Sequence, residues 1–305
     1  MIRLVIINPY SGNRRGQKYA KTIKKVFNNL ENEYNLNDRV FIEYTEYVGH
    51  AEEIAIEYGV KYKNENIAIY VVGGDGTVSE VTTAIKKKEN ISMVVIPKGT
   101  GNDLARAINS YRSIRKIIRA SIKNRPEKID TIDINHKVAA NMINVGLDAA
   151  IGNNVNHFRK IPFIPGSFKY KLAIAYTIFS PVKYKFKIRV DNKVLKGKYT
   201  LVAIGNNKYC GGGVNILPDA NIQDGYLDVC IVKNTTLFQK LIYLPKLMKG
   251  KHRGINLIEL LRCKKISIVS TRKFPISIDG EVTFTNKLIA KISEKSLSVI
   301  KTLDK

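Results

Sequence analysis

The stretch Ile67–Thr77, IAIYVVGGDGT, constrains the fold more than any other part of the sequence. Its first six residues form an unbroken apolar run, which is typical of a strand buried on both faces at the centre of a parallel sheet. The glycine turn Gly73-Gly74-Asp75-Gly76-Thr77 follows, and a pattern compatible with a helix continues from Val78 to Lys87. A strand, a glycine turn and a helix in this order present backbone N–H groups to a phosphate.

Asp75 is the unusual residue of this turn, because an acid beside a polyphosphate is repelled unless a cation lies between them. A glycine turn that carries an acid therefore suggests Mg²⁺ together with a nucleoside triphosphate. The alternative is an ordinary turn between a strand and a helix, in which Asp75 only caps the helix that follows. This stretch by itself leaves both interpretations open.

Similar turns follow two other expected strands. Ile2–Ile7 is followed by the turn Asn8–Gly16, in which Arg14 and Arg15 are suited to phosphate oxygens. Met93–Ile96 is followed by the turn PKGTGND, in which Asn102 or Asp103 can cap the next helix. In an open parallel sheet the carboxyl ends of the strands share one edge, so these turns should converge on one crevice.

The pattern changes after Pro126. Lys128–Ile134 and Val138–Val145 are predicted strands joined by a short turn at Asn135-His136, which indicates antiparallel pairing. Further short strands and two helices, at 168–179 and Leu237–Lys249, follow. We therefore predict an α/β plus all-β chain: a doubly wound parallel-sheet nucleotide-binding domain at residues 1–127 and an antiparallel β-sandwich domain at residues 128–305. The last strands of the second domain could fold back onto the first.

The composition limits the possible cellular compartment and the possible binding partners. The 305 residues contain no apolar run of the length that spans a bilayer and no signal-peptide pattern at the N-terminus. The three cysteines have no metal-binding spacing, which favours a reduced cytoplasmic compartment. The formal net charge of +25 suits nucleotides or an anionic membrane surface, and no nucleic-acid-binding signature accompanies it.

Four motifs in order, NPYSG, VVGGDGTVSEV, IPKGTGNDLAR and SIDGE, resemble the diacylglycerol kinase catalytic family, and the layout is closest to its bacterial soluble lipid kinases. GGDGT is shared with NAD kinases and phosphofructokinases, whereas its combination with GTGND-x-AR is highly specific. The resemblance implies an NAD kinase-like or phosphofructokinase-like nucleotide-binding domain, a lipid-acceptor role for the β domain, and Mg²⁺. It implies transfer of the γ-phosphoryl group of ATP to a lipid hydroxyl, with diacylglycerol and phosphatidic acid as the first expected substrate and product.

The resemblance also assigns residues. It places ATP at Asn8, Pro9, Tyr10, Ser11, Gly12, Thr45, Gly73, Gly74, Asp75, Gly76, Thr77 and Thr100. Asp75 would lie near the phosphates and a catalytic Mg²⁺, and is therefore expected to be catalytic. Family members often carry a Lys directly after the NP-x-SG turn, where this chain has Asn13; Arg14 is the candidate replacement, although Arg and Lys differ in reach and hydration.

Two assignments fall in the β domain. The carboxylate of Asp224 and the carbonyls of Asn221 and Tyr226 resemble a second, structural Mg²⁺ site; the alternative is a surface turn at Asp224-Gly225. Glu281 corresponds to the catalytic base, which accepts the proton of the attacking hydroxyl, in preference to Asp279. The alternative is that Asp279-Gly280 only forms a hairpin turn.

The expected partners are ATP, a membrane lipid and an anionic membrane surface, with a homodimer left open and no nucleic acid. Two basic and apolar segments, residues 159–166 and Leu237–Arg253, are candidates for peripheral contact with the inner face of the membrane. The alternative is that both segments pack on the β domain. Two other functions remain: an NAD kinase, and a nucleotide-binding membrane regulator without catalysis.

Overall fold

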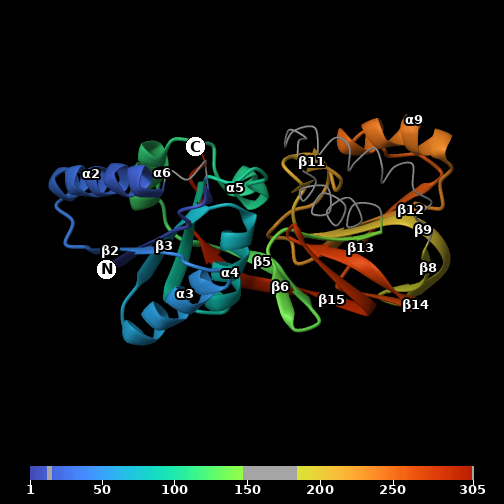
Figure 1. Ribbon diagram of the computed structural model, residues 1–305, viewed down its shortest axis with the longest axis horizontal. Helices are drawn as coiled ribbons and strands as arrows, with labels where there is room; N and C mark the ends of the chain where they lie inside the picture. Colours follow the sequence, from blue (N-terminus) through green and yellow to red (C-terminus); the bar gives the residue numbers. More distant parts are fainter. Residues whose placement is uncertain (12–15, 147–183, 304–305) are drawn as a thin grey trace, which may run out of the picture. The chain divides into compact units, whose positions relative to one another are not determined.

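The computed structural model describes residues 1–11, 16–146 and 184–303, which form two compact units (Figure 1). Unit 1 comprises Met1–Thr131 and the residues from Ser293 onward, and unit 2 comprises Ile132–Ile292. The division therefore lies beyond the predicted boundary at residues 127 and 128, and the end of the chain belongs to unit 1. The reason is that the chain passes between the units inside two strands, β5 (Glu127–Ile134) and β15 (Glu281–Val299), and not through a linker.

Unit 1 is built on a parallel sheet in the order β2-β1-β3-β4. The strands are β1 (Ile2–Ile7), β2 (Arg39–Tyr44), β3 (Ile67–Gly73) and β4 (Ile91–Pro97). The strands are in register, so that Ile7 pairs with both Tyr44 and Val72, and Gly73 pairs with Pro97. All four strands therefore end at the same edge of the sheet. The end of β15 continues the sheet beside β4, where Val299 pairs with Met93.

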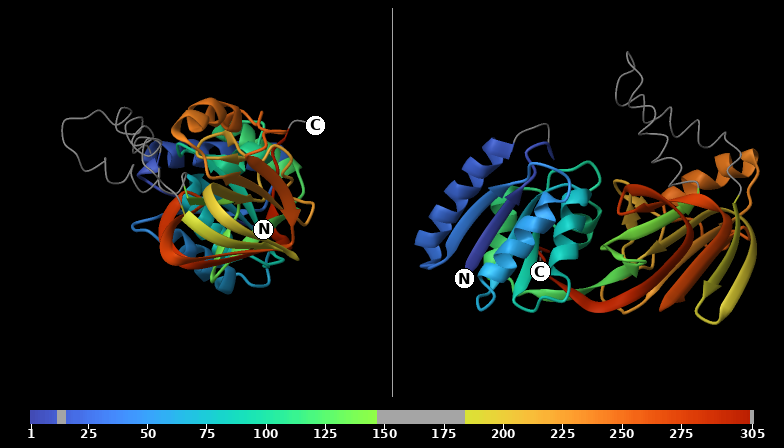
Figure 2. Two further views of the ribbon diagram at one scale, coloured as in Figure 1. Left: turned by 90° about the vertical axis from the view of Figure 1, so that its right-hand side faces the viewer. Right: turned by 60° about the horizontal axis from the view of Figure 1, so that its bottom comes forward.

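Helices cover both faces of this sheet (Figures 1 and 2). α2 (Gly16–Tyr34) and α6 (Ile114–Lys123) share one hydrophobic cluster with β1, β3 and β4, whereas α3 (His50–Lys61) and α4 (Asp75–Ile85) pack together on the other side. The spacing of buried Ile114, Ile117 and Ile118 shows how one apolar stripe seats α6 on the sheet. The doubly wound parallel prediction is confirmed.

Unit 2 is antiparallel. Its strands are β6 (Lys137–Ala139), β7 (Met142–Gly146), β8 (Tyr184–Val190), β9 (Lys193–Gly205), β10 (Tyr209–Cys210), β11 (Val214–Asn215), β12 (Leu227–Lys233), β13 (Ile258–Cys263) and β14 (Lys265–Ile278). Both β7 and β8 pair with β9 and with β14, so these four strands form a closed circuit. Shifts of register along β12 and β14 accompany the bending of the sheet.

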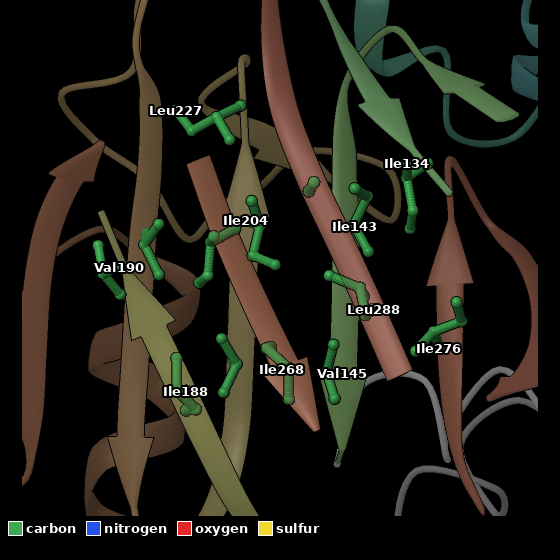
Figure 3. Packing of buried hydrophobic residues seen from close by; sticks show 14 of the residues in the cluster. Ile134, Ile143, Val145, Ile188, Val190, Ile204, Leu227, Ile268, Ile276 and Leu288 are labelled. Carbon is green, nitrogen blue, oxygen red and sulfur yellow. The ribbon is translucent and has the colours of Figure 1, made fainter. Parts of the chain in front are cut away.

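The interior of this circuit is the main core of unit 2 (Figure 3). Ile143, Ile188, Ile204, Ile268 and Ile276, from all four strands, are at most 1% exposed. A second cluster lies beneath α9 (Leu237–Met248), where Leu247 packs against the sheet; a capping box at Thr236 begins this helix. The predicted antiparallel β-sandwich domain is confirmed.

Two predicted strands of this unit differ from the structure. Val138–Val145 is split into β6 and β7, because the N–H groups of Ala140 and Asn141 donate to the carboxylate of Asp279 and not to a neighbouring strand. Conversely, one of the strands expected to be short is long: β14 runs without interruption from Lys265 to Ile278. The helix predicted at 168–179 and the loop at 159–166 lie outside the described residues.

Within the described ranges, no helix combines the length and the apolar character needed to cross a membrane. Cys210, Cys230 and Cys263 are all buried and free. Burial raises the pKa of the Cys230 and Cys263 thiols to about 12, so both stay protonated near neutral pH.

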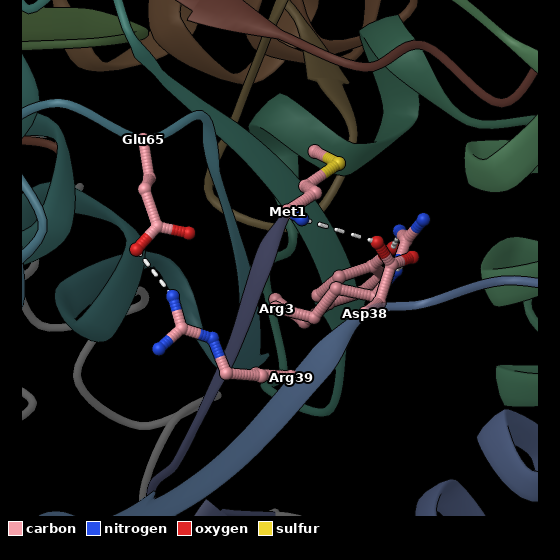
Figure 4. A network of polar contacts seen from close by, with 6 residues as sticks. Met1, Arg3, Asp38, Arg39 and Glu65 are labelled. Carbon is pink, nitrogen blue, oxygen red and sulfur yellow. Dashed lines mark hydrogen bonds and ion pairs between the residues drawn. The ribbon is translucent and has the colours of Figure 1, made fainter.

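A buried ion pair closes the amino-terminal edge of the unit 1 sheet (Figure 4). The Arg3 guanidinium donates from Nε to Asp38 Oδ2 at 2.6 Å and from a terminal nitrogen to the Tyr70 hydroxyl at 2.6 Å. The same hydroxyl lies 3.0 Å from Ser121 Oγ on α6. Nearby, Arg39 and Glu65 form an ion pair whose side chains are 56% and 37% exposed. The two pairs therefore differ mainly in burial.

Replacing Asp38 with Ala should destabilise the protein, because it leaves the buried guanidinium of Arg3 without its counter-charge. A loss of this kind costs about 3 kcal/mol, or roughly 6–12 °C in melting temperature. Glu65→Ala is the matched control and should leave the melting temperature nearly unchanged, since water solvates Arg39. Thermal unfolding followed by circular dichroism measures both; equal losses would contradict this account.

Candidate functional site

The turns at the carboxyl edge of the unit 1 sheet begin with backbone hydrogen bonds between neighbouring strands. Asn8 N–H donates to Val72 O at 3.0 Å, Thr45 N–H donates to Ile7 O at 3.0 Å, and Lys98 N–H donates to Gly73 O at 2.8 Å. These bonds extend the strand ladder by one residue after β1, β2 and β4. They fix the starting positions of the turns relative to one another.

The first turn is bound to the GGDGT turn through side chains. Asn8 Nδ2 donates to Thr77 Oγ1 at 3.2 Å, and Asn8 Oδ1 accepts from Tyr10 N–H at 3.0 Å. A Cβ atom at Gly73 would lie 2.6 Å from Thr77 Oγ1. Glycine is therefore required at position 73 for this contact between the turns.

Asp75 binds the GGDGT turn to the turn after β4. Its Oδ2 accepts from Asn102 N–H and its Oδ1 accepts from Asp103 N–H, both at 2.7 Å. These N–H groups begin α5 (Asp103–Ile108) and have no acceptor within that helix. The N-cap of α4 is Gly74, which provides no side-chain bond. Asp75 thus caps α5. The local sequence pattern had suggested that it caps α4, the helix that follows it directly.

Glycines allow this close approach. A Cβ at Gly99 would lie 2.4 Å from Gly74 Cα, and a Cβ at Gly101 would lie 2.2 Å from Asp75 Oδ2. Asn102, at φ 54°, accepts from Gly99 N–H at 2.9 Å and donates to Gly99 O at 2.6 Å. The N-cap residue of α5 is Asn102, and its side chain makes no capping bond to the helix, contrary to one of the two predicted caps. The Asn102 side chain instead closes the turn on itself.

The sequence analysis did not assign Lys98, which places a cation at this edge of the sheet. Its ammonium lies 5.1 Å from the centre of the Tyr19 ring on α2, and burial lowers the pKa of Lys98. A lysine placed directly between a strand and a glycine turn is the signal that could have identified it. Arg14 and Gly12 lie outside the described residues.

The other predicted nucleotide-binding residues of unit 1 differ in exposure. Thr45 is buried and Gly76 lies in the first turn of α4. Tyr10 and Thr100 are exposed, and Pro9 and Ser11 are partly buried. The structure therefore brings Asn8, Thr77 and the Asp75 turn into direct contact, and leaves Tyr10 and Thr100 at the surface of their turns.

In unit 2, SIDGE forms a two-residue hairpin between β14 and β15. Asp279 and Gly280 have φ values of 46° and 96°, and Ile278 pairs with Glu281. The carboxylate of Asp279 accepts from the N–H groups of Ala140, Asn141 and Met142 at 2.7–3.0 Å. Asp279 therefore holds the turn. Glu281 is exposed, and its carboxylate makes no hydrogen bond or ion pair with the described residues.

The predicted second metal loop contains ion pairs. Asp224 Oδ1 accepts from Tyr226 N–H at 3.0 Å, and Asp224 Oδ2 pairs with the guanidinium of Arg262 on β13. Asn221 Oδ1 accepts from Gln223 N–H at 3.1 Å. Arg262 also approaches Asp228, with Nε 3.7 Å from Oδ1.

Asp228 was not predicted, and it adds negative charge to this loop. Its pKa is raised to about 6, mainly by burial; Arg262 opposes this rise, and the neighbouring Asp224 and Asp219 add to it. Its Oδ2 is buried without a hydrogen-bond partner in the part of the chain described. The same part contains no group of three acidic, His or Cys side chains arranged around one metal. Oxygen donors of this kind suit a hard cation, but Asp224 could bind one only if Arg262 gave up its pairing with that carboxylate.

Comparisons with known proteins agree with this architecture. The diacylglycerol kinase catalytic domain model matches residues 3–134, and the YegS C-terminal NAD kinase beta sandwich-like domain model matches residues 141–301. A Staphylococcus epidermidis protein named as a candidate lipid kinase is 25% identical over 257 residues, which are 80% of this chain and 81% of that protein. A similarly named Staphylococcus aureus protein is 25% identical over 261 residues, covering 82% of this chain and 83% of that protein.

Solved structures share the fold. A crystal structure of a candidate diacylglycerol kinase from Bacillus anthracis superposes with a TM-score of 0.78 at 24% identity, covering 98% of this chain and 97% of that chain. A second Bacillus anthracis structure, described as a diacylglycerol kinase, has a TM-score of 0.72 at 21% identity and covers 98% of this chain and 96% of that chain. With the two family models together spanning nearly all of the described sequence, the chain belongs to the diacylglycerol kinase catalytic domain family and carries its YegS-type C-terminal β-sandwich domain.

Proposed function

We propose that this lipid kinase family member transfers the γ-phosphoryl group of ATP to a lipid hydroxyl, with diacylglycerol as the first expected acceptor and phosphatidic acid as its product. The observation that carries the proposal is the pair of glycine turns joined by Asp75 at the carboxyl edge of the parallel sheet. Turns without Cβ atoms at such an edge expose backbone N–H groups to phosphate oxygens. The family membership supports the lipid acceptor.

The nucleotide phosphates would lie against the GGDGT turn, with the first turn and Thr100 beside them. The Asn8–Thr77 hydrogen bond supports this arrangement because it holds the first turn at the GGDGT turn. Lys98 is a cation at the same edge, and Arg14 is the candidate for the position where family members often have Lys. Both would offset phosphate charge.

Mg²⁺, when bound with ATP, would neutralise charge between the β- and γ-phosphates. Asp75 is the acid proposed to orient the hydrated ion: each of its oxygens accepts a backbone N–H, and a carboxylate oxygen has a second acceptor position. Asn221, Asp224 and Tyr226 would hold a second, structural Mg²⁺. The buried Asp228 oxygen supports a cation at that loop.

On the acceptor side, Glu281 would orient the lipid hydroxyl and accept its proton. The carboxylate of Glu281 is exposed and has no partner in the described ranges, which supports this role. Asp279 is the less suitable base because its carboxylate already accepts three backbone N–H groups. An enzyme with this acceptor would work peripherally, at a membrane surface.

Incubation of the purified protein with labelled ATP and a total lipid extract tests the proposal, followed by identification of the labelled product. A labelled phospholipid is expected. NAD supplied in a parallel reaction distinguishes an NAD kinase. Tight ATP binding without transfer to lipid or NAD would identify a nucleotide-binding regulator.

Asp75→Asn should lower turnover by orders of magnitude while the cores of both units stay folded, and it should lower the melting temperature slightly because α5 loses one of its two acceptors. The amide offers only one oxygen to the two N–H groups of α5, and it removes the charge that would orient the ion. Steady-state kinetics at saturating ATP and Mg²⁺, with melting temperatures for both proteins, measure this effect. Near-normal turnover would contradict the phosphate-site assignment.

Gly101→Ala provides a second test of the same contact, because its Cβ would lie 2.2 Å from Asp75 Oδ2 and must displace that carboxylate. Gly197→Ala is the matched control; its Cβ would meet nothing closer than 3.4 Å. Turnover should fall for Gly101→Ala and stay at the parent level for Gly197→Ala.

Glu281→Gln should slow the chemical step by roughly 10²–10⁴-fold, the usual contribution of a positioned general base. The amide keeps the size of the side chain but cannot accept the proton. ATP affinity should stay close to the parent value, since the nucleotide site is assigned to unit 1. Single-turnover phosphorylation and ATP titration separate the two effects.

Asp279→Asn is the paired variant. It should lower the melting temperature through the loss of N–H acceptors and reduce the chemical step less than Glu281→Gln. If Asp279→Asn is inactive at an unchanged melting temperature while Glu281→Gln reacts at the parent rate, the two roles are reversed.

Mg²⁺ without ATP should raise the melting temperature of the parent protein by several degrees if Asp224 binds a structural ion. An ion at about 100 times its dissociation constant contributes roughly 2.7 kcal/mol. Asp224→Ala should lose this response, and the control Asp219→Ala, which removes a carboxylate paired with Arg253, should keep it. A parent melting temperature indifferent to Mg²⁺ would remove the second metal.

A further inference from the structure

The hairpin of β8 and β9 places four lysines directly opposite one another. Lys185 pairs with Lys198 and Lys187 pairs with Lys196, and all four side chains are exposed. Phe186, between the two β8 lysines, is buried in the core of unit 2, so the lysines point away from that core. Like charges directly opposite on neighbouring strands destabilise a sheet. This hairpin therefore carries a cost in stability that its fold does not require.

These four lysines line an open groove of about 450 Å³, with Val269, Ser270 and Thr271 of the β14 segment on its other side. We call it the lysine groove. No acidic residue lines it, and none of the four lysines has an ion pair with the described residues. Lys193, at the turn of the same hairpin, is instead paired with Glu259. Among the described residues, nothing pairs with the positive charge of the groove.

The start of α9 lies beside this groove. Asn234 N–H donates to Lys198 O at 3.0 Å, and Thr235 Oγ1 lies 2.8 Å from Thr200 Oγ1 on β9. α9 then exposes apolar side chains: Phe238 is 71% exposed and Leu241 is 52% exposed. From residue 234 to residue 258 the chain contains no Asp or Glu. Exposed apolar groups and uncompensated cations are thus neighbours on one part of unit 2.

We propose that the lysine groove and the first turns of α9 form the surface by which the protein docks on an anionic bilayer. The lysines contact headgroup phosphates, and Phe238 and Leu241 enter the apolar boundary below the headgroups. This pairing of basic and apolar side chains is the chemistry of interfacial membrane binding. The inference rests on the proposed function only in that a lipid kinase must reach a bilayer, and its test uses neither ATP nor turnover.

Co-sedimentation with vesicles of phosphatidylcholine and phosphatidylglycerol measures the electrostatic part. Changing all four groove lysines to Gln should weaken binding by about 600-fold, because each cation near an anionic surface contributes roughly a factor of five. The matched control changes Lys18, Lys21, Lys24 and Lys25, exposed on α2 of unit 1, to Gln and should stay within about threefold of the parent. Equal losses in both variants would overturn the proposal, since only the total charge would then matter.

The apolar part is the binding that persists at high salt. Phe238→Ser with Leu241→Ser should abolish it, whereas Ile56→Ser with Val60→Ser, which removes two exposed apolar groups from α3, should leave it intact. Salt-resistant binding that survives the α9 change would overturn the insertion.

Two further measurements separate the explanations. The groove variant should melt about 1–4 °C above the parent, because it removes two repulsive cross-strand pairs; a lower melting temperature with lost binding would point to misfolding and overturn the docking role. The second measurement adds a mixed RNA and duplex DNA probe to the parent protein and vesicles; the probe should leave the binding to vesicles in place. If the groove change abolishes nucleic-acid binding and spares vesicle binding, the partner is wrong. If the groove variant loses vesicle binding and the parent protein shows no kinase activity, the docking surface is supported and the proposed function is rejected.

Discussion

Much of the candidate site depends on one carboxylate. Asp75 satisfies the first N–H groups of α5 and thereby joins two turns that are separate in sequence. The contact is possible only because Gly74, Gly99 and Gly101 leave no Cβ atoms in the way. A short helix whose N–H groups lack acceptors would otherwise fray, and the turn before it would lose its position. The same residue thus supports the local fold and faces the proposed chemistry.

The sequence predicts those features of the site that depend on neighbouring residues, and it misses those that depend on residues far apart in the chain. The buried strand Ile2–Ile7 was predicted to the residue, because a continuous apolar run is a local signal. The partner of Asp75 lies 27 positions away, and a local reading could only suggest that Asp75 caps the helix beside it. Asp279 binds N–H groups 137 to 139 positions away, which is why the break between β6 and β7 was missed.

The division into two units shows the same contrast between local and long-range features. The change from helix-containing to strand-rich sequence near residue 128 was visible, and a return of the last strands to the first domain was anticipated. That β5 and β15 each continue from one unit into the other was not predicted, because a strand pattern by itself does not show where one core ends and the next begins. The lysine groove is different again. Its members were visible only as part of a net positive charge, and the pairing register is what turns four separate lysines into one surface.

The path of β15 also sets an order of events for the growing chain. β4 pairs with β3 on one side, but it gains its second parallel neighbour only when the residues around Val299 are present. Thr302 likewise pairs with Asn109 in the same unit. Translation produces these residues after the whole of unit 2. The edge of the first unit to leave the ribosome therefore stays unpaired while the second unit is made, and an unpaired strand edge is open to pairing with other chains. Completion of the unit 1 sheet is in this way coupled to successful synthesis of unit 2.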